Sequence, residues 1–453
     1  MKVGDTVRDR AGVVYRLDRE YLDGAQAHAF RAYREGDSGD DPLVVKIYKN
    51  AENDRETRLE RIIASGPMIV RGLPDRTLCF PFAQVDTPDG DGVVMPHTPL
   101  DSVAMSHDDL FEDPFARQYC INHLNRICDG IIPYKMMYLN AFHLARAIDR
   151  MYRAGFAHCD FSFNNIFINT KTGQASIIDL DNLAVEGFLT PRVIGTPGFI
   201  APELDSDRTR LPDHTTDAHS LAVIIFFMLL GRHPLVGIKK NPHLEDRLFG
   251  SDALFTEHPA DRRNTFAPDI GFHYEELPSA IRKLFMQAFV DGLHDPARRP
   301  SATQWIDPLW ASVDTMVACR HCCQTTPVQS LTHSTIHPPA NQCIFCGKAL
   351  RGPLFALRFS NGQVKALEEG SRLYPHHLLG NAHQYDFSTV LADCKKHCSG
   401  EIILANRSAR PITAHFRSGN QKSIQQQQGF PLKTTRRIEF SSTVIADVED
   451  LSA

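Results

Sequence analysis

The chain has 453 residues, 42% of them hydrophobic and 23% charged, and a formal net charge of −5. This length exceeds what one hydrophobic core supports, so it predicts two or three domains. The slight acidic balance gives no reason to expect a nucleic acid or an anionic membrane as a partner, and no apolar run is long enough to span a bilayer. The N-terminus lacks the apolar core of a signal peptide, so we expect a cytoplasmic protein.

The N-terminal part of the chain predicts strands joined by turns. A strand at 13–17 leads to a turn at Gly24, and a second strand, at 42–48, carries Lys46 between apolar residues. Taken alone, the turn is a plain hairpin and Lys46 is an ordinary residue of an edge strand.

A helix and a further strand follow. The helix at 53–65 presents Glu56 and Glu60 one turn apart on the same face. The strand at 92–98 reaches Pro96, which lacks an N–H group but keeps its carbonyl. By itself this segment is a strand that proline ends.

The stretch 157–203 carries the strongest chemical signal. Asp160 stands five residues before Asn165, and Asp179 follows a β-branched run further on. Phosphoryl transfer from a metal nucleotide needs such groups, one carboxylate to orient a hydroxyl and accept its proton and two oxygen ligands for Mg²⁺. The structural alternative is an Asp-Asn turn followed by an ordinary buried strand and a proline turn.

This stretch resembles the catalytic and activation segments of the bacterial eukaryotic-like (Hanks-type) serine/threonine protein kinases. The family patterns are H-R-D-x-x-x-x-N, D-F-G and A-P-E, and the matching residues are His158-Cys159-Asp160 with Asn165, Asp179-Leu180-Asp181, and Ala201-Pro202-Glu203. The likeness extends from about residue 9 to residue 310. It implies a bilobal kinase fold, and it makes Asp160, Lys46, Asn165 and Asp179 the expected catalytic residues.

The resemblance also implies ATP and Mg²⁺ as ligands. Lys46 is expected to pair with the α- and β-phosphates and to be held by a helix glutamate; Glu56 fits the family spacing best, and Glu60 stays an alternative. Adenine is expected to meet the Pro96 carbonyl and the Thr98 N–H group. The expected nucleotide-binding residues are Gly24, Lys46, Glu56, Pro96, Thr98, Asn165 and Asp179, the last two as magnesium ligands.

Two further positions match structural residues of the family. A helix at 134–154 is expected to carry the catalytic loop, and Asp217 matches the residue that anchors the backbone of that loop. Arg299 matches the arginine that pairs with the A-P-E glutamate, here Glu203.

Several residues depart from the family pattern. Cys159 replaces the arginine that binds a phosphorylated activation segment, so Thr190 is expected to have little regulatory weight. Thr196 matches the threonine that contacts the catalytic loop. Ser162 stands where serine/threonine kinases usually carry a lysine, and Leu180 and Asp181 replace the Phe and Gly of D-F-G, which predicts a less mobile turn.

Beyond residue 312 the cysteines predict a metal site. The chain has eleven cysteines, and four form two C-x-x-C pairs separated by twenty residues, at Cys319, Cys322, Cys343 and Cys346. Four thiolates close a tetrahedral zinc site with no open position for water, so the zinc is expected to be structural. The segment resembles a zinc ribbon; the alternative is a set of free thiols.

The remaining residues predict a β-domain. Strand-like segments at 354–359, 400–406, 412–416 and 437–440 alternate with turns. The segment faintly resembles forkhead-associated sandwich domains, but Asn381 occupies the place of their phosphothreonine-binding arginine. We therefore expect a sandwich that binds a protein partner without recognising phosphate.

These observations together predict an α+β protein. The expected parts are a kinase N-lobe and hinge at 1–98, a C-lobe at 99–312, a zinc ribbon at 315–350 and an all-β sandwich at 352–449. The predicted function is ATP-dependent phosphorylation of serine and threonine hydroxyls on protein substrates. The alternative is a pseudokinase scaffold that binds nucleotide and partners without catalysis. The order of the parts resembles that of kinases associated with a von Willebrand A-type protein and a metal-dependent phosphatase.

Overall fold

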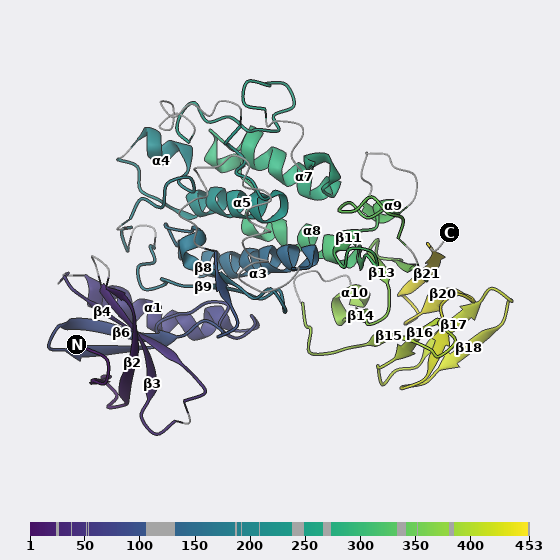
Figure 1. Ribbon diagram of the computed structural model, residues 1–453, viewed down its shortest axis with the longest axis horizontal. Helices are drawn as coiled ribbons and strands as arrows, with labels where there is room; N and C mark the ends of the chain where they lie inside the picture. Colours follow the sequence, from purple (N-terminus) through teal and green to yellow (C-terminus); the bar gives the residue numbers. More distant parts are fainter. Residues whose placement is uncertain are drawn as a thin grey trace. The chain divides into compact units, whose positions relative to one another are not determined.

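The computed structural model describes the chain (Figure 1) except for residues 24–26, 38, 51, 53, 106–131, 186–187, 192, 208, 238–248, 266–272, 333–340, 351, 380–384 and 452–453. Two compact units make up the chain. The first comprises Met1–Gly130, Leu139–Gly271 and Lys283–Ile306, and the second comprises Ile131–Tyr138, Phe272–Arg282 and Asp307–Ala453. Among the helices described, none has the length and hydrophobicity needed to cross a membrane.

The first unit begins with an antiparallel six-stranded sheet of strand order β1-β2-β3-β4-β6-β5. Its strands are β1 (Thr6–Arg8), β2 (Val14–Asp23), β3 (Ala27–Arg34), β4 (Leu43–Tyr48), β5 (Ala83–Thr87) and β6 (Gly90–Pro96). Successive side chains of a strand point to opposite faces. In β4, Val45 and Ile47 therefore enter one apolar core, and Lys46 and Tyr48 lie on the other face.

Helix α1 (Arg55–Val70) packs on that second face. Leu59 is buried in the same cluster as Tyr48 and Met95, so the helix covers the face that carries Lys46. The helix extends past the predicted end at residue 65 even though it contains Pro67. Its buried stripe includes Ile62 and Ile69, but it also includes two arginines, Arg55 and Arg58.

Two long helices form the centre of the rest of this unit. Helix α3 (Tyr134–Arg153) confirms the predicted helix before the catalytic loop, and α5 (His214–Leu230) is buried along almost its whole length. Asp213 caps α5 by accepting hydrogen bonds from the N–H groups of Thr215 and Thr216, and Gly231 ends it in the left-handed conformation.

A small sheet of order β7-β8-β9 accompanies these helices. It contains β7 (Val103–Ala104), β8 (Ile166–Ile168) and β9 (Ala175–Ile177). The antiparallel pairing of β8 with β9 places Asn165, just before β8, beside the residues that follow β9. The other short elements of this unit are η1 (Phe163–Asn165), α4 (Pro202–Ser206), η4 (Gln287–Asp291) and η5 (Pro296–Arg298). The element η3 (Tyr274–Glu276) belongs to the second unit, and α7 (Ser279–Met286) and α8 (Ala302–Asp314) each have residues in both units.

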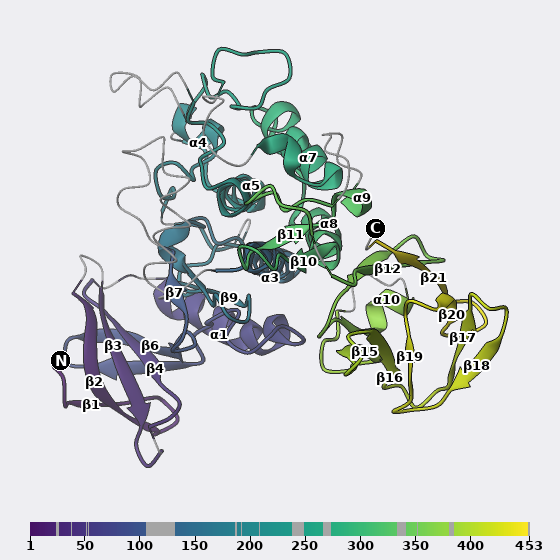
Figure 2. The ribbon, with the colours of Figure 1, turned by 45° about the vertical axis from the view of Figure 1, so that its right-hand side comes forward.

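The second unit is rich in β-structure, as Figure 2 shows. A hairpin of β10 (Met316–Ala318) and β11 (Thr325–Pro327) precedes the short helix α9 (Gln329–Thr332). Two antiparallel sheets follow, of order β13-β12-β21-β20-β17-β18 and β14-β15-β16-β19. Their strands are β12 (Phe355–Phe359), β13 (Val364–Leu367), β14 (Arg372–Leu373), β15 (Ala392–Lys396), β16 (Ile402–Asn406), β17 (Ile412–Phe416), β18 (Gln421–Ile424), β19 (Gly429–Pro431), β20 (Thr435–Glu439) and β21 (Ile445–Asp450), with helix α10 (Pro375–Leu379) after β14.

One apolar core joins the two sheets. Leu357 and Ile438 from the first sheet and Leu404 and Phe430 from the second belong to the same buried cluster. Burial alternates along β21, where Ala446 and Val448 enter this core and Asp447 between them is exposed, which matches the pattern of a sandwich whose inner faces pack together. The C-terminal β-region thus forms a two-sheet sandwich.

Candidate functional site

The loop between α3 and β8, which the sequence predicts to be the catalytic loop, is held by a buried carboxylate of α5. Asp217 accepts hydrogen bonds from the N–H groups of His158 (2.6 Å) and Cys159 (2.9 Å). Cys159 has a φ of +66°, a conformation that is uncommon for residues other than glycine, and the two hydrogen bonds hold it there. Burial raises the pKa of Asp217. The sequence-based expectation that Asp217 anchors this loop is confirmed.

Asp160 projects from this loop beside two hydroxyl groups. Its Oδ1 accepts a hydrogen bond from Thr196 Oγ1 at 2.7 Å, and Thr196 Oγ1 also lies 3.1 Å from Ser162 Oγ. The carbonyl oxygen of Asp160 accepts a hydrogen bond from Asn165 Nδ2 at 2.8 Å. The structure therefore brings Asp160 and Asn165 together and adds Thr196, as the motif spacing predicted.

Asp179 lies near Asn165 because the residue before it, Ile178, is hydrogen-bonded to the Asn165 backbone. The N–H group of Ile178 donates to the Asn165 carbonyl at 3.0 Å, and Asp179 follows with a φ of +62°. Burial raises the pKa of Asp179, but the Lys46 ammonium outweighs this effect and holds the pKa below its ordinary value. An ionised carboxylate and the side-chain oxygen of Asn165 are ligands of the kind that Mg²⁺ prefers.

Lys46 contacts two carboxylates from the D-L-D turn. Its Nζ lies 2.5 Å from Asp179 Oδ1 and 3.0 Å from Asp181. Burial lowers the pKa of Lys46, but the two carboxylates outweigh burial and raise it, so the ammonium is charged. Sequence reasoning gave Asp181 no role at the lysine.

Glu56 is not the partner of Lys46, which corrects the sequence-based expectation. Its side chain is 63% exposed, and its Oε1 pairs with Arg10 Nη1 at 2.8 Å. Glu60 is exposed as well. Both glutamates lie outside the buried stripe of α1, so the rotation of the helix directs them to solvent.

The expected adenine-binding residues occupy the end of β6. Pro96 pairs with Leu43 across the sheet, and the His97 N–H group donates to the Pro42 carbonyl at 3.3 Å. Thr98 is buried. Gly24, the expected loop glycine, lies outside the described residues.

Arg58 is a site residue that sequence reasoning missed. Its side chain is 1% exposed, and its guanidinium donates to the carbonyl oxygens of Leu183 and Thr190, both at 2.8 Å. A cation therefore contacts the predicted activation segment, although Cys159 stands where the resemblance places an arginine. The helical spacing from Arg58 to Ile62 was a usable signal, because it puts the arginine on the buried stripe of α1.

Glu203 and Arg299 form the predicted structural ion pair. Arg299 Nη1 lies 2.7 Å from Glu203 Oε1, and Arg299 Nη2 lies 2.6 Å from Oε2. The guanidinium also donates to backbone carbonyls, including that of Gly292. This two-pronged contact ties the A-P-E segment to the loop before α8.

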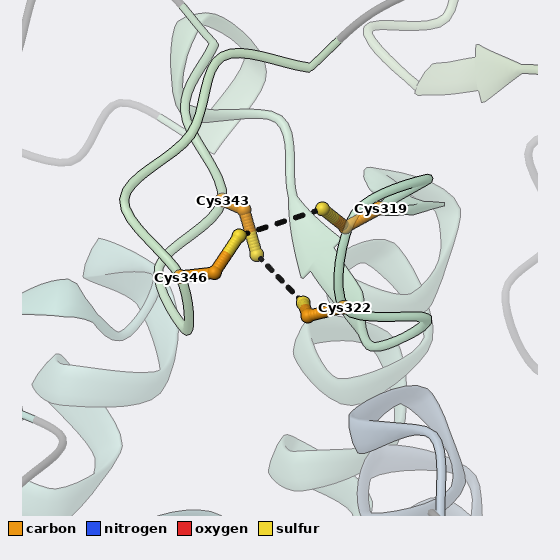
Figure 3. A group of neighbouring side chains, drawn as sticks. All are labelled: Cys319, Cys322, Cys343 and Cys346. Carbon is orange, nitrogen blue, oxygen red and sulfur yellow. Dashed lines mark hydrogen bonds between the residues drawn. The ribbon is translucent and has the colours of Figure 1, made fainter.

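The four paired cysteines of the second unit converge, as Figure 3 shows. Cys319 Sγ lies 3.7 Å from Cys346 Sγ, Cys322 Sγ lies 3.6 Å from Cys343 Sγ, and all four sulfur atoms lie within 4.8 Å of one another. Thiolates that surround one zinc ion at about 2.3 Å in tetrahedral geometry lie about 3.8 Å apart. The sulfur positions therefore fit a zinc ion.

The two cysteine turns share one backbone pattern. The N–H groups of Cys319 and Cys343 each donate to a carbonyl five residues later, and the N–H groups of Cys323 and Gly347 each donate back to the first cysteine of their turn. Cys323 and Gly347 both have positive φ, +61° and +68°. The positive φ of Gly347 closes a tight turn after the second cysteine pair, a conformation that glycine adopts readily.

A second group of possible donors is buried between α8 and α10. Asp314 pairs with Lys365 Nζ at 2.6 Å and with His377 Nε2 at 3.1 Å, and His376 lies close by. Burial raises the pKa of Asp314, but Lys365 and His377 outweigh burial and hold the pKa well below its ordinary range. Because an ammonium already neutralises the carboxylate, this group serves as an internal ion pair.

Comparison with known proteins gives a family match for the middle of the chain. Residues 116–311 match the sequence family described as the protein kinase domain. A probable serine/threonine-protein kinase zyg-1 from Caenorhabditis elegans is 31% identical over 97 residues, which cover 20% of this chain and 13% of that protein. A probable serine/threonine-protein kinase WNK5 from Oryza sativa subsp. japonica is 26% identical over 164 residues, covering 35% of this chain and 42% of that protein. The chain thus spans less than half the length of these relatives.

Among solved structures, the chain resembles the crystal structure of a Toxoplasma gondii specific rhoptry antigen kinase domain. The identity is 12%, the match covers 68% of this chain and 84% of the other, and the TM-score is 0.42. A likeness at this level carries no argument about the site.

Proposed function

We propose that the chain, whose residues 116–311 match the protein kinase domain, transfers the γ-phosphoryl group of ATP to serine and threonine hydroxyls of protein substrates. The observation that carries the proposal is the catalytic loop: Asp217 holds its backbone, and Asp160 and Asn165 project from it beside Asp179. The serine/threonine kinases among the relatives support the same class of acceptor.

Each residue has a role that follows from its chemistry. Asp160 orients the acceptor hydroxyl and takes its proton as the oxygen bonds to the γ-phosphorus and the bond to the leaving ADP oxygen breaks. Asn165 and Asp179 are the residues that would hold Mg²⁺, which neutralises phosphate charge when bound. Lys46 is charged and lies on β4, the neighbour of β6 in the sheet, and it would pair with the phosphates. The Pro96 carbonyl and the Thr98 N–H group would bind adenine.

A nucleotide-binding scaffold without catalysis is the competing function, and one contact favours it. Lys46 lies 2.5 Å from Asp179 and so engages the carboxylate that a magnesium ion needs. In the active-kinase proposal, Asp179 would leave Lys46 to hold Mg²⁺, and Lys46 would turn to the phosphates when the nucleotide binds. A scaffold would keep it.

Radiolabelled ATP separates the two functions. The wild type should phosphorylate itself or a generic protein substrate in Mg²⁺, and Asp160→Asn and Asp179→Ala should each lower the rate on the order of 10²-fold or more, because each removes an electrostatic component of the transition state. Asp205→Asn, which changes an exposed carboxylate of α4, serves as the matched control. Unchanged transfer in both site variants would refute the proposal.

We further propose that the four cysteines bind one structural zinc ion as a zinc ribbon. The sulfur distances and the paired turns support this proposal. All four ligands come from the protein, so the ion has no open position and would act on folding rather than on catalysis.

The sandwich is proposed to bind a protein partner without recognising phosphate. Asn381, which stands for the phosphate-binding arginine of forkhead-associated domains, lies outside the described residues. Arg407 donates to both carboxylate oxygens of Asp393 at 3.0 Å, so an ion pair within the sandwich already uses this guanidinium. A von Willebrand A-type protein and a metal-dependent phosphatase as partners, and a cytoplasmic location, stay predictions from the sequence.

A further inference from the structure

The lysine of β4 has two carboxylate partners that differ in their surroundings. Asp179 is partly exposed, at 35% of its side chain, whereas the Asp181 side chain is fully enclosed. Asp179 is also the residue proposed to hold Mg²⁺. A carboxylate that must turn to a metal cannot be the lasting partner of Lys46, so the buried one is the candidate.

Asp181 is held in place by a second contact with β4. Both of its carboxylate oxygens lie 3.0 Å from Lys46 Nζ, and Oδ2 accepts a hydrogen bond from the Tyr48 hydroxyl at 2.6 Å. Tyr48 is itself fixed, because the Arg55 guanidinium lies 4.1 Å from the centroid of its ring. Residues 46 and 48 point to the same face of the strand, so one carboxylate bridges both.

We propose that Asp181 is a positioning residue that holds Lys46 toward the nucleotide phosphates in place of a helix glutamate. The phosphate-binding role of Lys46 rests on the proposed kinase function, whereas its contact with Asp181 does not. Its consequence is that Lys46 does not depend on a carboxylate of α1, since Glu56 pairs with Arg10 and Glu60 is exposed. The third position of the D-L-D turn thereby gains a function that the glycine of the family cannot supply.

The first test compares steady-state kinetics of matched variants. Asp181→Asn keeps the size of the side chain and removes its charge, and we expect its kcat/KM for ATP in saturating Mg²⁺ to fall by about tenfold or more, largely through a higher KM. Glu56→Gln should keep wild-type constants. Loss of activity in Glu56→Gln, with or without loss in Asp181→Asn, would overturn the proposal.

The second test needs no catalysis. Amine acylation over a range of pH, followed by mass spectrometry of the Lys46 peptide, gives the midpoint at which this amine becomes reactive, with the exposed Lys422 as an internal reference. The groups facing Lys46 are Asp179, Asp181 and the Tyr48 hydroxyl. Removal of the Asp181 charge should lower the midpoint by at least about one pH unit; an unchanged midpoint would contradict the contact.

Asp179→Ala keeps the test decisive even if Asp181→Asn does not fold. In that variant Asp181 alone should hold the Lys46 midpoint above that of Lys422. A midpoint at or below that of Lys422 would overturn the proposal. If the wild type transfers no phosphate, the proposed function fails while these titrations still decide whether Asp181 holds Lys46.

Discussion

Arg58→Met should release the activation segment from α1. The guanidinium of Arg58 is buried and donates to the carbonyl oxygens of Leu183 and Thr190, at 2.8 Å each. Methionine keeps much of the apolar stem and removes both hydrogen bonds. The segment also has backbone hydrogen bonds of its own, from the Val185 N–H group to the Leu189 carbonyl and from the Leu189 N–H group to the Val185 carbonyl. Protection of these amides from exchange reports whether the segment keeps its folded conformation.

The magnitude follows from the two contacts to the segment. Hydrogen bonds from a charged donor contribute about 1.5–3 kcal/mol each, so the pair stabilises the closed segment by about 3–6 kcal/mol. The third contact, to Asp54 at 3.2 Å, is with a carboxylate that is 57% exposed and adds about 0–1 kcal/mol to α1 itself. A loss of 3 kcal/mol raises the opened population by roughly 100-fold, since about 1.4 kcal/mol is a factor of ten.

Hydrogen–deuterium exchange measures this opening directly. Peptides covering residues 183–190 should exchange about 100-fold faster in Arg58→Met, and kinase activity should fall with them. Arg71→Met, which changes an exposed arginine just beyond the same helix, is the control. Exchange at wild-type rates in Arg58→Met would show that the two hydrogen bonds of Arg58 do not hold the segment, and would refute the prediction.

Three further outcomes are expected. Thr190→Ala should change kinase activity little, because Arg58 contacts the carbonyl of residue 190 and not its side chain. Thr196→Val should lower kcat by about tenfold, because it removes the hydroxyl that is hydrogen-bonded to Asp160. An inactive Thr190→Ala enzyme whose activity Thr190→Glu restored would contradict this expectation. Chelation of zinc or Cys343→Ser should unfold the cysteine turns, because metal binding contributes about 10 kcal/mol or more to such folds, while transfer to a generic substrate survives; less than half an equivalent of zinc by mass spectrometry would count against the site. Burial lowers the pKa of His233 to about 4. As the pH falls below about 6.5, the unfolded chain therefore protonates this histidine before the folded chain does. The free energy of unfolding should fall by about 2 kcal/mol between pH 7 and pH 5 because of His233. Denaturant midpoints of the wild type should fall over this range more than those of His233→Gln, and equal falls would refute the assignment.

Zinc loss should also reach the start of α3 within the second unit. The N–H group of Tyr134 donates to Gln324 Oε1 at 2.9 Å, and that of Lys135 donates to Thr325 Oγ1 at 2.6 Å. These side chains follow the first cysteine turn and act as caps for a helix whose first N–H groups have no partner within it. Catalysis that fails entirely on zinc removal would mean that this cap transmits to the catalytic loop, and the expectation of separable parts would be wrong.

The sequence by itself determined the features that depend on local spacing. Asp160 and Asn165 share one loop, so their separation in the chain predicts their proximity, and the hydrogen bond between Asn165 and the Asp160 carbonyl agrees. The two C-x-x-C turns likewise carry their geometry in their own residues, since Cys323 and Gly347 take positive φ at equivalent places. Helix α3 followed from its apolar periodicity.

Only the tertiary structure decided which groups meet across elements. The partner of Lys46 depends on the rotation of α1, and burial of Arg58 on one stripe sends Glu56 to solvent, where it pairs with Arg10. The carboxylate that pairs with Lys46 is instead that of Asp181, which lies in a turn far along the chain. The order of the sandwich strands was equally beyond the sequence, because period-two alternation predicts which face is buried but not which strand lies beside it.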